Sequence, residues 1–250
     1  MLAEQTASEA GRAAEAGAGR AAVSLSGVTK VFNPGKTQVT ALKEVSAEIH
    51  AGEFLAVTGP SGSGKTTLLN LIGCIDRPTS GRVAIEGETV GHLSPDKLAD
   101  LRSRKLGLIF QTFNLIPVLT VGENAEYPLM LRRPTAGRRE RRARVLEVLA
   151  SLGIGGLIDR FPNELSGGEC QRAAIARALV TKPPIVLADE PTSNLDSRTG
   201  DSILSLLTRL HEQQGITFVF STHDANLTRR AGRVIELRDG KIVGGYARWV

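Results

Sequence analysis

Aromatic residues, cysteines and long apolar stretches are all scarce in this sequence of 250 residues. Only 4% of the residues are aromatic although 41% are hydrophobic, so the core must be built from aliphatic side chains, as in parallel α/β sheets. A chain of this length can bury one good core with a small subdomain beside it.

The low cysteine count excludes two kinds of structural support. Cys74 and Cys170 are too few for a disulfide framework or a zinc site. We interpret each as a small apolar or helix-surface residue in a reducing compartment.

No stretch of the sequence is apolar enough to cross a membrane. The longest uncharged run, 106–122, is interrupted by polar residues and a proline, and is shorter than about 20 apolar residues. Residues 1–22 lack the apolar segment of a signal peptide and are expected to form a disordered tail or a frayed helix. The sequence therefore predicts a cytosolic protein, whose membrane role would come from a partner.

The net charge of +5 suits an anionic partner, which could be a nucleotide, a nucleic acid or a membrane surface. Five arginines lie between positions 138 and 144, but no aromatic residue that could stack on a base lies among them. We interpret them as a solvated helix face, and no nucleic acid is expected as a partner.

Hydrophobic runs alternate between strand and helix patterns along most of the chain. The helix predicted at 138–153 places Val145, Leu146, Leu149 and Leu152 on one face. Strands are expected at 23–32, 39–49, 54–59, 81–90, 185–190 and 217–224, then a hairpin turning at Asp-Gly within 233–245, and a helix at 65–73. This order predicts an α/β fold with a largely parallel central sheet and an inserted helical segment at about 112–165.

The stretch GPSGSGKT at 59–66 has the spacing of a phosphate-binding loop and stands between a predicted strand and a predicted helix. Gly62 and Gly64 would let backbone N–H groups curl around a phosphate. Lys65 would place its charge on the β/γ-phosphate oxygens, and the Thr66 hydroxyl is a hard ligand for Mg²⁺. The nucleotide-binding residues predicted from this stretch are Gly59, Pro60, Ser61, Gly62, Ser63, Gly64, Lys65, Thr66 and Thr67.

Two adjacent carboxylates end the buried run IVLADE at 185–190. Alternation along a strand would point Asp189 and Glu190 to different sides, so they need not share a role. Asp189 suits the magnesium shell and Glu190 suits a general base acting on water. A solvated turn is the alternative for an isolated Asp-Glu pair.

The stretch LSGGE at 165–169 has a second set of features suited to an anion. Ser166 and Glu169 form the S-x-x-E pattern of a capping box for a helix that starts near Gly167. Capping alone does not explain Gly167 and Gly168 in the first turn, where each glycine costs up to about 1 kcal/mol relative to alanine.

Together with GPSGSGKT and IVLADE, LSGGE gives residues 23 to about 245 a resemblance to the ATP-binding cassette (ABC) family. The resemblance implies that two copies pair head to tail, and that Ser166, Gly167 and Gly168 meet the ATP held by the partner's phosphate loop. It also implies a P-loop NTPase (RecA-like) core formed by 23–111 and 166–250, with an N-terminal antiparallel β subdomain and an inserted helical subdomain at about 112–165.

Further site residues follow only from this resemblance. Phe32 matches an aromatic that stacks on adenine, Gln111 the glutamine that senses magnesium and water, Asp196 a residue that reaches across the dimer, and His223 in STHD a contact of the γ-phosphate. The alternatives are a core aromatic for Phe32, an ordinary buried or solvated glutamine for Gln111 and a core histidine with satisfied hydrogen bonds for His223. Ser193, where glycine is usual, and Cys170, where Gln or Arg is common, depart from the family pattern.

The stretches 71–81, 111–129 and 187–197 look like the lipoprotein-releasing (LolD) and macrolide-export (MacB) ATPases, with FtsE a near relative. This implies a separate permease with few transmembrane helices and a location at the cytoplasmic face of the cell membrane, with FNLIPVLTV at 113–121 helping to form the permease groove. The alternative is a non-transport ABC ATPase acting on DNA or the ribosome. The single cassette, without zinc-ligating cysteines or coiled coils, argues against that alternative, and LSGGE argues against a kinase or GTPase.

Overall fold

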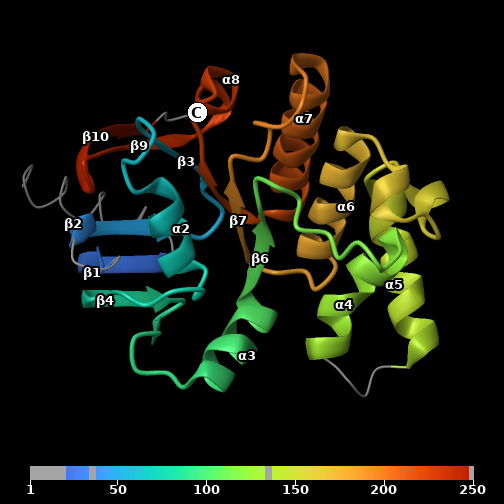
Figure 1. The fold of residues 1–250 in the computed structure, drawn as a ribbon, viewed down its shortest axis with the longest axis horizontal. Coiled ribbons are helices and arrows are strands. Elements are labelled where there is room, and N and C mark those ends of the chain that lie inside the picture. Colours follow the sequence, from blue (N-terminus) through green and yellow to red (C-terminus); the bar gives the residue numbers. More distant parts are fainter. Residues whose placement is uncertain (1–20, 34–37, 133–136, 248–250) are drawn as a thin grey trace, which may run out of the picture.

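The computed structural model describes residues 21–33, 38–132 and 137–247. Its larger sheet has six strands in the order β10-β9-β3-β8-β7-β6 (Figure 1). These are β3 (Phe54–Thr58), β6 (Leu106–Ile109), β7 (Ile185–Asp189), β8 (Thr217–Ser221), β9 (Arg233–Arg238) and β10 (Lys241–Ala247). All neighbours pair in parallel except β9 and β10, so the prediction of an α/β fold with a mostly parallel sheet is confirmed.

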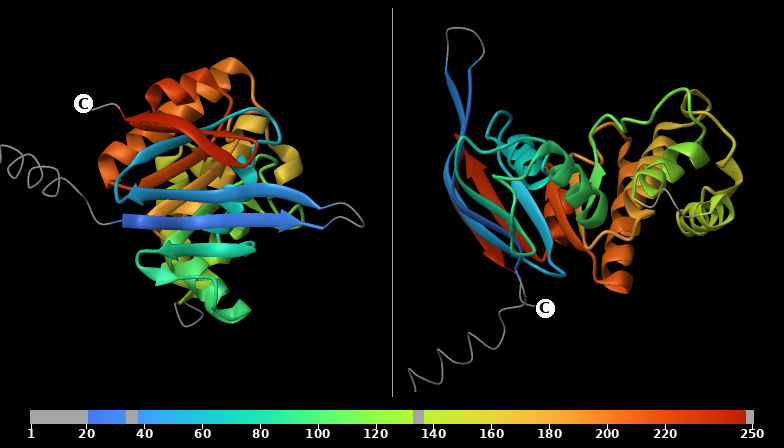
Figure 2. Two further views of the ribbon diagram at one scale, coloured as in Figure 1. Left: turned by 90° about the vertical axis from the view of Figure 1, so that its left-hand side faces the viewer. Right: turned by 90° about the horizontal axis from the view of Figure 1, so that it is seen from below.

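A second, antiparallel sheet is formed mainly by the N-terminal part of the chain. It has the order β2-β1-β4-β5, with β1 (Ala21–Phe32), β2 (Val39–His50), β4 (Ser80–Ile85) and β5 (Glu88–Thr89). The helix α2 (Lys65–Ile72) lies between the two sheets (Figure 2). Of the predicted tail, only the last two residues are described, and they begin β1.

The central strands are buried on both faces, which explains their uninterrupted apolar sequences. In β8, Phe218 and Phe220 join a core that faces the long helices, whereas Val219 between them joins a core shared with α2 and the antiparallel sheet. Side chains alternate across a strand, so each run of hydrophobic residues supplies both cores at once.

The helices are α3 (Pro95–Lys105), α4 (Val121–Arg132), α5 (Arg138–Ser151), α6 (Gly167–Leu179), α7 (Ser197–Gln214) and α8 (Ala225–Arg230). Two short 3₁₀ turns, Gly155–Leu157 and Pro162–Glu164, join α5 to α6. In Figure 1, α4 and α5 stand beside α6, away from the antiparallel sheet. The predicted Asp-Gly hairpin is also present, with φ of 49° at Asp239 and 78° at Gly240.

One prediction for α5 was wrong and another holds in part. Leu146 is 42% exposed, and Val148 takes its place on the buried face with Val145 and Leu149. Three of the five arginines, Arg138, Arg139 and Arg142, are exposed, as expected for a solvated helix face. The other two fasten α5 to its neighbours: the Arg141 guanidinium lies 2.7 Å from Glu126 of α4, and Arg144 donates to the Val180 carbonyl at 3.0 Å.

Candidate functional site

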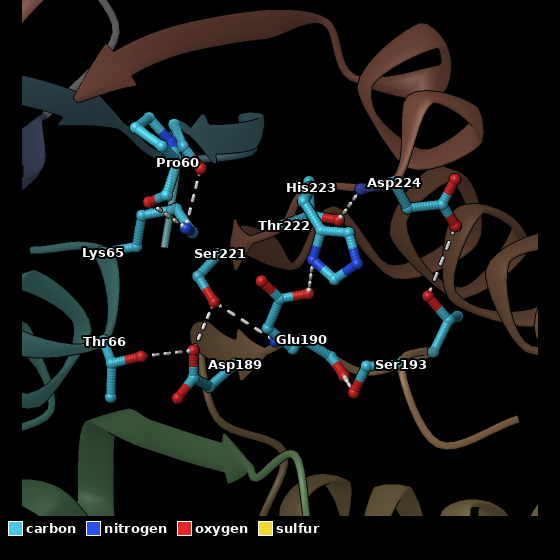
Figure 3. Close-up of polar contacts among 12 residues, drawn as sticks. Pro60, Lys65, Thr66, Asp189, Glu190, Ser193, Ser221, Thr222, His223 and Asp224 are labelled. Atoms are coloured by element: carbon cyan, nitrogen blue, oxygen red, sulfur yellow. Dashed lines mark hydrogen bonds and ion pairs between the residues drawn. The ribbon is translucent and has the colours of Figure 1, made fainter. Parts of the chain in front are cut away.

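The carboxyl ends of β3, β7 and β8 meet at one edge of the larger sheet, and the predicted phosphate loop follows β3 there (Figure 3). The loop curls around Lys65, whose ammonium donates to the carbonyl oxygens of Gly59 at 2.8 Å and Pro60 at 3.1 Å. Lys65 is 9% exposed. The loop therefore holds a positive charge at its centre through its own backbone carbonyls.

Two features show that this loop fits a phosphate group. The helix α2 begins without a side-chain cap, so its first N–H groups stay available to an anion. The Ser63 hydroxyl is buried and has no hydrogen-bond partner among the described residues. A phosphate oxygen would supply the hydrogen-bond acceptor that both the N–H groups and the hydroxyl lack.

The backbone at Gly64 explains part of the glycine pattern. Its φ is 105°, and a Cβ built there would lie 2.6 Å from the Ala41 carbonyl oxygen. The glycine therefore lets the loop approach the antiparallel sheet. At Gly62, where φ is 78°, no atom lies within 4 Å of a built Cβ, so this glycine is required by its backbone conformation rather than by space.

Hard oxygen atoms suited to a divalent cation lie beside the loop. The Thr66 hydroxyl donates to Asp189 Oδ1 at 3.1 Å, and the buried Ser221 hydroxyl donates to the same oxygen. Once its proton is committed to Asp189, the Thr66 oxygen can offer only lone pairs outward. Thr66 and Asp189 thus fit Mg²⁺, which prefers carboxylate and hydroxyl oxygens.

Glu190 points away from Asp189 and toward His223 (Figure 3), but it follows the end of β7, so the turn after the strand, and not the expected strand alternation, directs it. Its Oε2 lies 2.7 Å from His223 Nδ1. The Glu190 side chain is 14% exposed, whereas that of His223 is 69% exposed, so the contact joins a sheltered carboxylate to an open imidazole. The Glu190 backbone has a φ of 47°, which a non-glycine residue adopts only when its surroundings hold it there.

The LSGGE stretch forms the predicted capping box at the start of α6. The Glu169 carboxylate accepts the Ser166 N–H at 2.8 Å, and the Ser166 hydroxyl accepts the Glu169 N–H at 3.4 Å. The hydrogen bonds from Ser166 hold the pKa of Glu169 below its usual range. Gly168 has a packing reason besides backbone exposure, because a Cβ there would lie 2.6 Å from the Thr199 methyl group of α7.

A hollow of about 600 Å³ joins LSGGE to the SNLD stretch at 193–196. Asp196 caps α7 by accepting the Thr199 N–H at 3.0 Å, and the hydrogen bonds to Thr199 lower the pKa of its carboxyl. The hollow is lined by Ser166, Gly167, Gly168, Glu169, Arg172, Asn194, Leu195, Asp196, Arg198, Thr199 and Ser202. No residue of the phosphate loop is among them, so the two anion-suited segments occupy separate surfaces.

Gln111 follows β6, and its carbonyl oxygen accepts a hydrogen bond from Asn194 Nδ2 at 2.7 Å. Phe32 is 40% exposed at the end of β1, which excludes the core-aromatic alternative. The Lys30 ammonium lies 4.8 Å from the centre of its ring.

The sequence reasoning missed Ser221 and the contact of Asn194 with Gln111. Both residues stand inside stretches that it had quoted, STHD with its preceding strand and SNLD. Of the two departures from the family pattern, the Ser193 hydroxyl donates to the Glu190 carbonyl at 3.0 Å, and the Cys170 thiol lies 3.6 Å from the Pro162 carbonyl. Ser193 therefore supports the turn that carries Glu190.

A family model described as "ABC transporter" matches residues 42–193. An uncharacterized ABC transporter ATP-binding protein of Methanocaldococcus jannaschii, MJ0796, is 48% identical over 88% of this chain and 94% of its own length. The macrolide export ATP-binding/permease protein MacB of Hyphomonas neptunium is also 48% identical over 88% of this chain, which spans 34% of that protein.

A solved dimeric structure of MJ0796, in a post-hydrolysis state bound to ADP and Pi, matches with a TM-score of 0.86. The identity is 46%, with 91% of this chain and 99% of that chain covered. No helix in the described ranges has the length and apolar character needed to span a membrane. The chain belongs to the ABC transporter family, as an ATP-binding subunit that hydrolyses ATP.

Proposed function

We propose that the residues 59–67 bind ATP together with Mg²⁺, and that the neighbouring strand ends carry out its hydrolysis. Lys65 exchanges its two loop carbonyl partners for β- and γ-phosphate oxygens, and Ser63 and the first N–H groups of α2 hold the phosphates. Phe32, whose ring is partly exposed at the end of β1, stacks on the adenine.

In this proposal, Thr66 and Asp189 would hold the magnesium ion, and Gln111, which follows β6, would contribute its side-chain oxygen. When bound, Mg²⁺ neutralises charge that develops on the phosphate oxygens. The hydrogen bond from the Thr66 hydroxyl to Asp189 would leave the threonine lone pairs free for the ion.

Glu190 is the general base of the proposed reaction. One carboxylate oxygen, Oε2, is held by His223, which leaves Oε1 to take a proton from the attacking water. His223 is mostly exposed, so it can also reach the γ-phosphate side of the site. The observation that carries the proposal is this pair, which adjoins the Thr66–Asp189 oxygens at one sheet edge (Figure 3).

We further propose that the chain works as a head-to-tail dimer with a second copy of itself. The surface formed by Ser166, Gly167, Gly168 and Asp196 carries no residue of its own phosphate loop. It therefore has an anion-suited helix start that its own nucleotide does not use, which a partner's ATP would satisfy. The dimeric solved structures of MJ0796 support this arrangement.

A separate integral-membrane permease is the proposed partner at the cytoplasmic face of the membrane. The similarity to MacB, a protein described as both ATP-binding and permease, supports this pairing and the MacB/LolD-like branch. An apolar groove of about 490 Å³ between β6, α3, α4 and α6 suits a permease helix. Its lining includes Leu106, Phe110, Pro128 and Leu131.

The groove differs from the one predicted from FNLIPVLTV. None of the residues 113–121 lines this groove, although Val118 is 78% exposed; Val121 is fully buried and Leu115 packs against the core. The groove is lined instead by α3, β6 with Phe110, α4 and α6.

The experiment is co-purification of tagged Glu190→Gln protein from solubilised membranes with ATP, with partners identified by mass spectrometry. A membrane protein with few helices and a large extracytoplasmic domain is expected. A many-helix importer permease would contradict the MacB/LolD-like branch alone. Recovery only with DNA or ribosomes would contradict the transport role and favour the alternative, for which the relatives reported above give no support.

A further inference from the structure

Ser221 occupies a central place in the sheet edge that carries the site. It ends β8, pairs in register with Asp189 of β7 on one side and with Val57 of β3 on the other, and is fully buried. The phosphate loop begins two residues after Val57. Ser221 therefore lies between the strand that delivers the phosphate loop and the strand that delivers the two carboxylates.

The Ser221 hydroxyl contacts both of those acidic residues. It donates its proton to Asp189 Oδ1 and accepts the Glu190 N–H at 3.2 Å (Figure 3). The Ser221 carbonyl accepts the same N–H at 3.1 Å, so the Glu190 amide is shared between two oxygens of one residue. A hydroxyl has one proton and two acceptor positions, which matches this pattern of one donation and one acceptance.

These contacts fix the orientation of the Asp189 carboxylate and the backbone conformation of Glu190. Asp189 Oδ1 accepts hydrogen bonds from both Ser221 and Thr66. These two bonds fix the carboxylate and leave its other oxygen, Oδ2, uninvolved in them. Glu190 has a left-handed backbone, which is strained for a residue with a side chain. Its bonded N–H retains the turn that directs the carboxylate toward His223.

We propose that Ser221 is a positioning residue for ATP hydrolysis, whose single hydroxyl orients Asp189 toward the magnesium ion and holds Glu190 in its reactive turn. This inference rests on the proposed roles of Asp189 and Glu190. An apolar residue at position 221 would pack in the same space but would supply neither bond from its side chain.

The test compares Ser221→Ala with Thr217→Val. Both remove a buried hydroxyl from β8, but that of Thr217 accepts the Gly52 N–H at 2.9 Å, at the other end of the strand. Purified full-length variants are assayed for steady-state hydrolysis at varied free Mg²⁺. ATP affinity is measured by calorimetry with Mg²⁺ and, separately, with EDTA. Circular dichroism melting shows whether each variant folds.

Ser221→Ala is expected to lower kcat about tenfold and to raise the Mg²⁺ concentration for half-maximal rate severalfold, as for loss of a hydrogen bond to a charged group. The gain in ATP affinity on adding Mg²⁺ should shrink by a similar factor, with affinity in EDTA unchanged. Thr217→Val should leave both Mg²⁺ readouts as in the wild type. Ser221→Cys, which keeps a weak donor and acceptor, should fall between wild type and Ser221→Ala.

The inference is overturned if Ser221→Ala retains the wild-type kcat and Mg²⁺ dependence, or if Thr217→Val changes them equally. Should Ser221→Ala fail to fold, Ser221→Cys with wild-type values would overturn it. Glu190→Gln separates this failure from that of the proposed function. If Glu190→Gln loses hydrolysis while Ser221→Ala behaves as the wild type, the inference alone fails; if Glu190→Gln still hydrolyses ATP, the proposed function fails.

Discussion

The imidazole Nδ1 of His223 and the carboxylate Oε2 of Glu190 lie 2.7 Å apart, although one residue follows β8 and the other follows β7. The contact leaves most of the histidine surface exposed while the carboxylate is sheltered. An exposed side chain that orients a sheltered acid can be removed with little effect on folding, so its contribution to chemistry can be measured separately.

His223→Ala should therefore lower ATP hydrolysis about a hundredfold, within the range for loss of a positioned acid–base group, while ATP binding changes less than threefold. The melting temperature should stay within about 2 °C of the wild type, since the side chain is 69% exposed. His92→Ala, which removes another exposed histidine outside the site, is the matched control. Full activity of His223→Ala would contradict the proposed role.

Lys65→Ala should abolish measurable ATP binding, because the ammonium is the positive charge that the phosphate loop encloses. Binding is measured by calorimetry, with circular dichroism to show that the variant is folded. Lys43→Ala, an exposed lysine of β2, should bind as the wild type does. Retained affinity in Lys65→Ala would refute the assignment of the nucleotide site.

Ser166→Ala separates the capping role of this serine from its proposed contact with a partner's ATP. Loss of the helix cap should destabilise the fold by about 1 kcal/mol. The same loss is expected for Ser94→Ala, since Ser94 caps α3 by accepting the Lys97 N–H at 3.4 Å. Only Ser166→Ala should also lose hydrolysis, as measured in the otherwise wild-type protein. It should likewise lose the ATP-dependent dimer, as measured by analytical ultracentrifugation in the Glu190→Gln background. Equal behaviour of the two variants would reduce Ser166 to a helix cap.

Cys74 makes stability depend on pH above neutrality. Burial raises the pKa of its thiol to about 11 from an ordinary value of 9.0, against an opposing effect of Arg102. The folded state therefore favours the protonated thiol, and this contribution is complete below pH 9 and is lost as the pH rises toward 11. The full loss amounts to about 3 kcal/mol, and urea unfolding at pH 8, 9.5 and 10.5 should show a steeper loss of stability for the wild type than for Cys74→Ala. Parallel curves would contradict the assignment.

The sequence predicted the parts of the fold that local patterns determine. The unbroken apolar runs of β7 and β8 indicated buried parallel strands, and Ser166 with Glu169 indicated where α6 begins. Local patterns could not predict contacts that depend on strand register. Ser221 reaches Asp189 only because β7 and β8 pair in parallel at that position.

The error at Leu146 has a similar cause. Val145, Leu146, Val148 and Leu149 all fit a helical repeat, and which face is buried depends on how α5 packs against α4 and α6. The left-handed backbone of Glu190 was also unpredictable, because glutamate has no local preference for that conformation. The contacts that hold it are a tertiary hydrogen bond to Ser221 and a bond from Ser193 within the turn itself.

The hydrogen bond from Asn194 to the Gln111 carbonyl gives the molecule a short mechanical link. Residue 111 continues from the strand that lines the apolar groove, and Asn194 lines the hollow that contains the start of α6. In the proposed assembly, this one hydrogen bond joins the segment beside the permease groove to the surface that would meet the second copy. A displacement of Gln111 by one partner would therefore reach Asn194, and the start of α6 beside it, through a single contact.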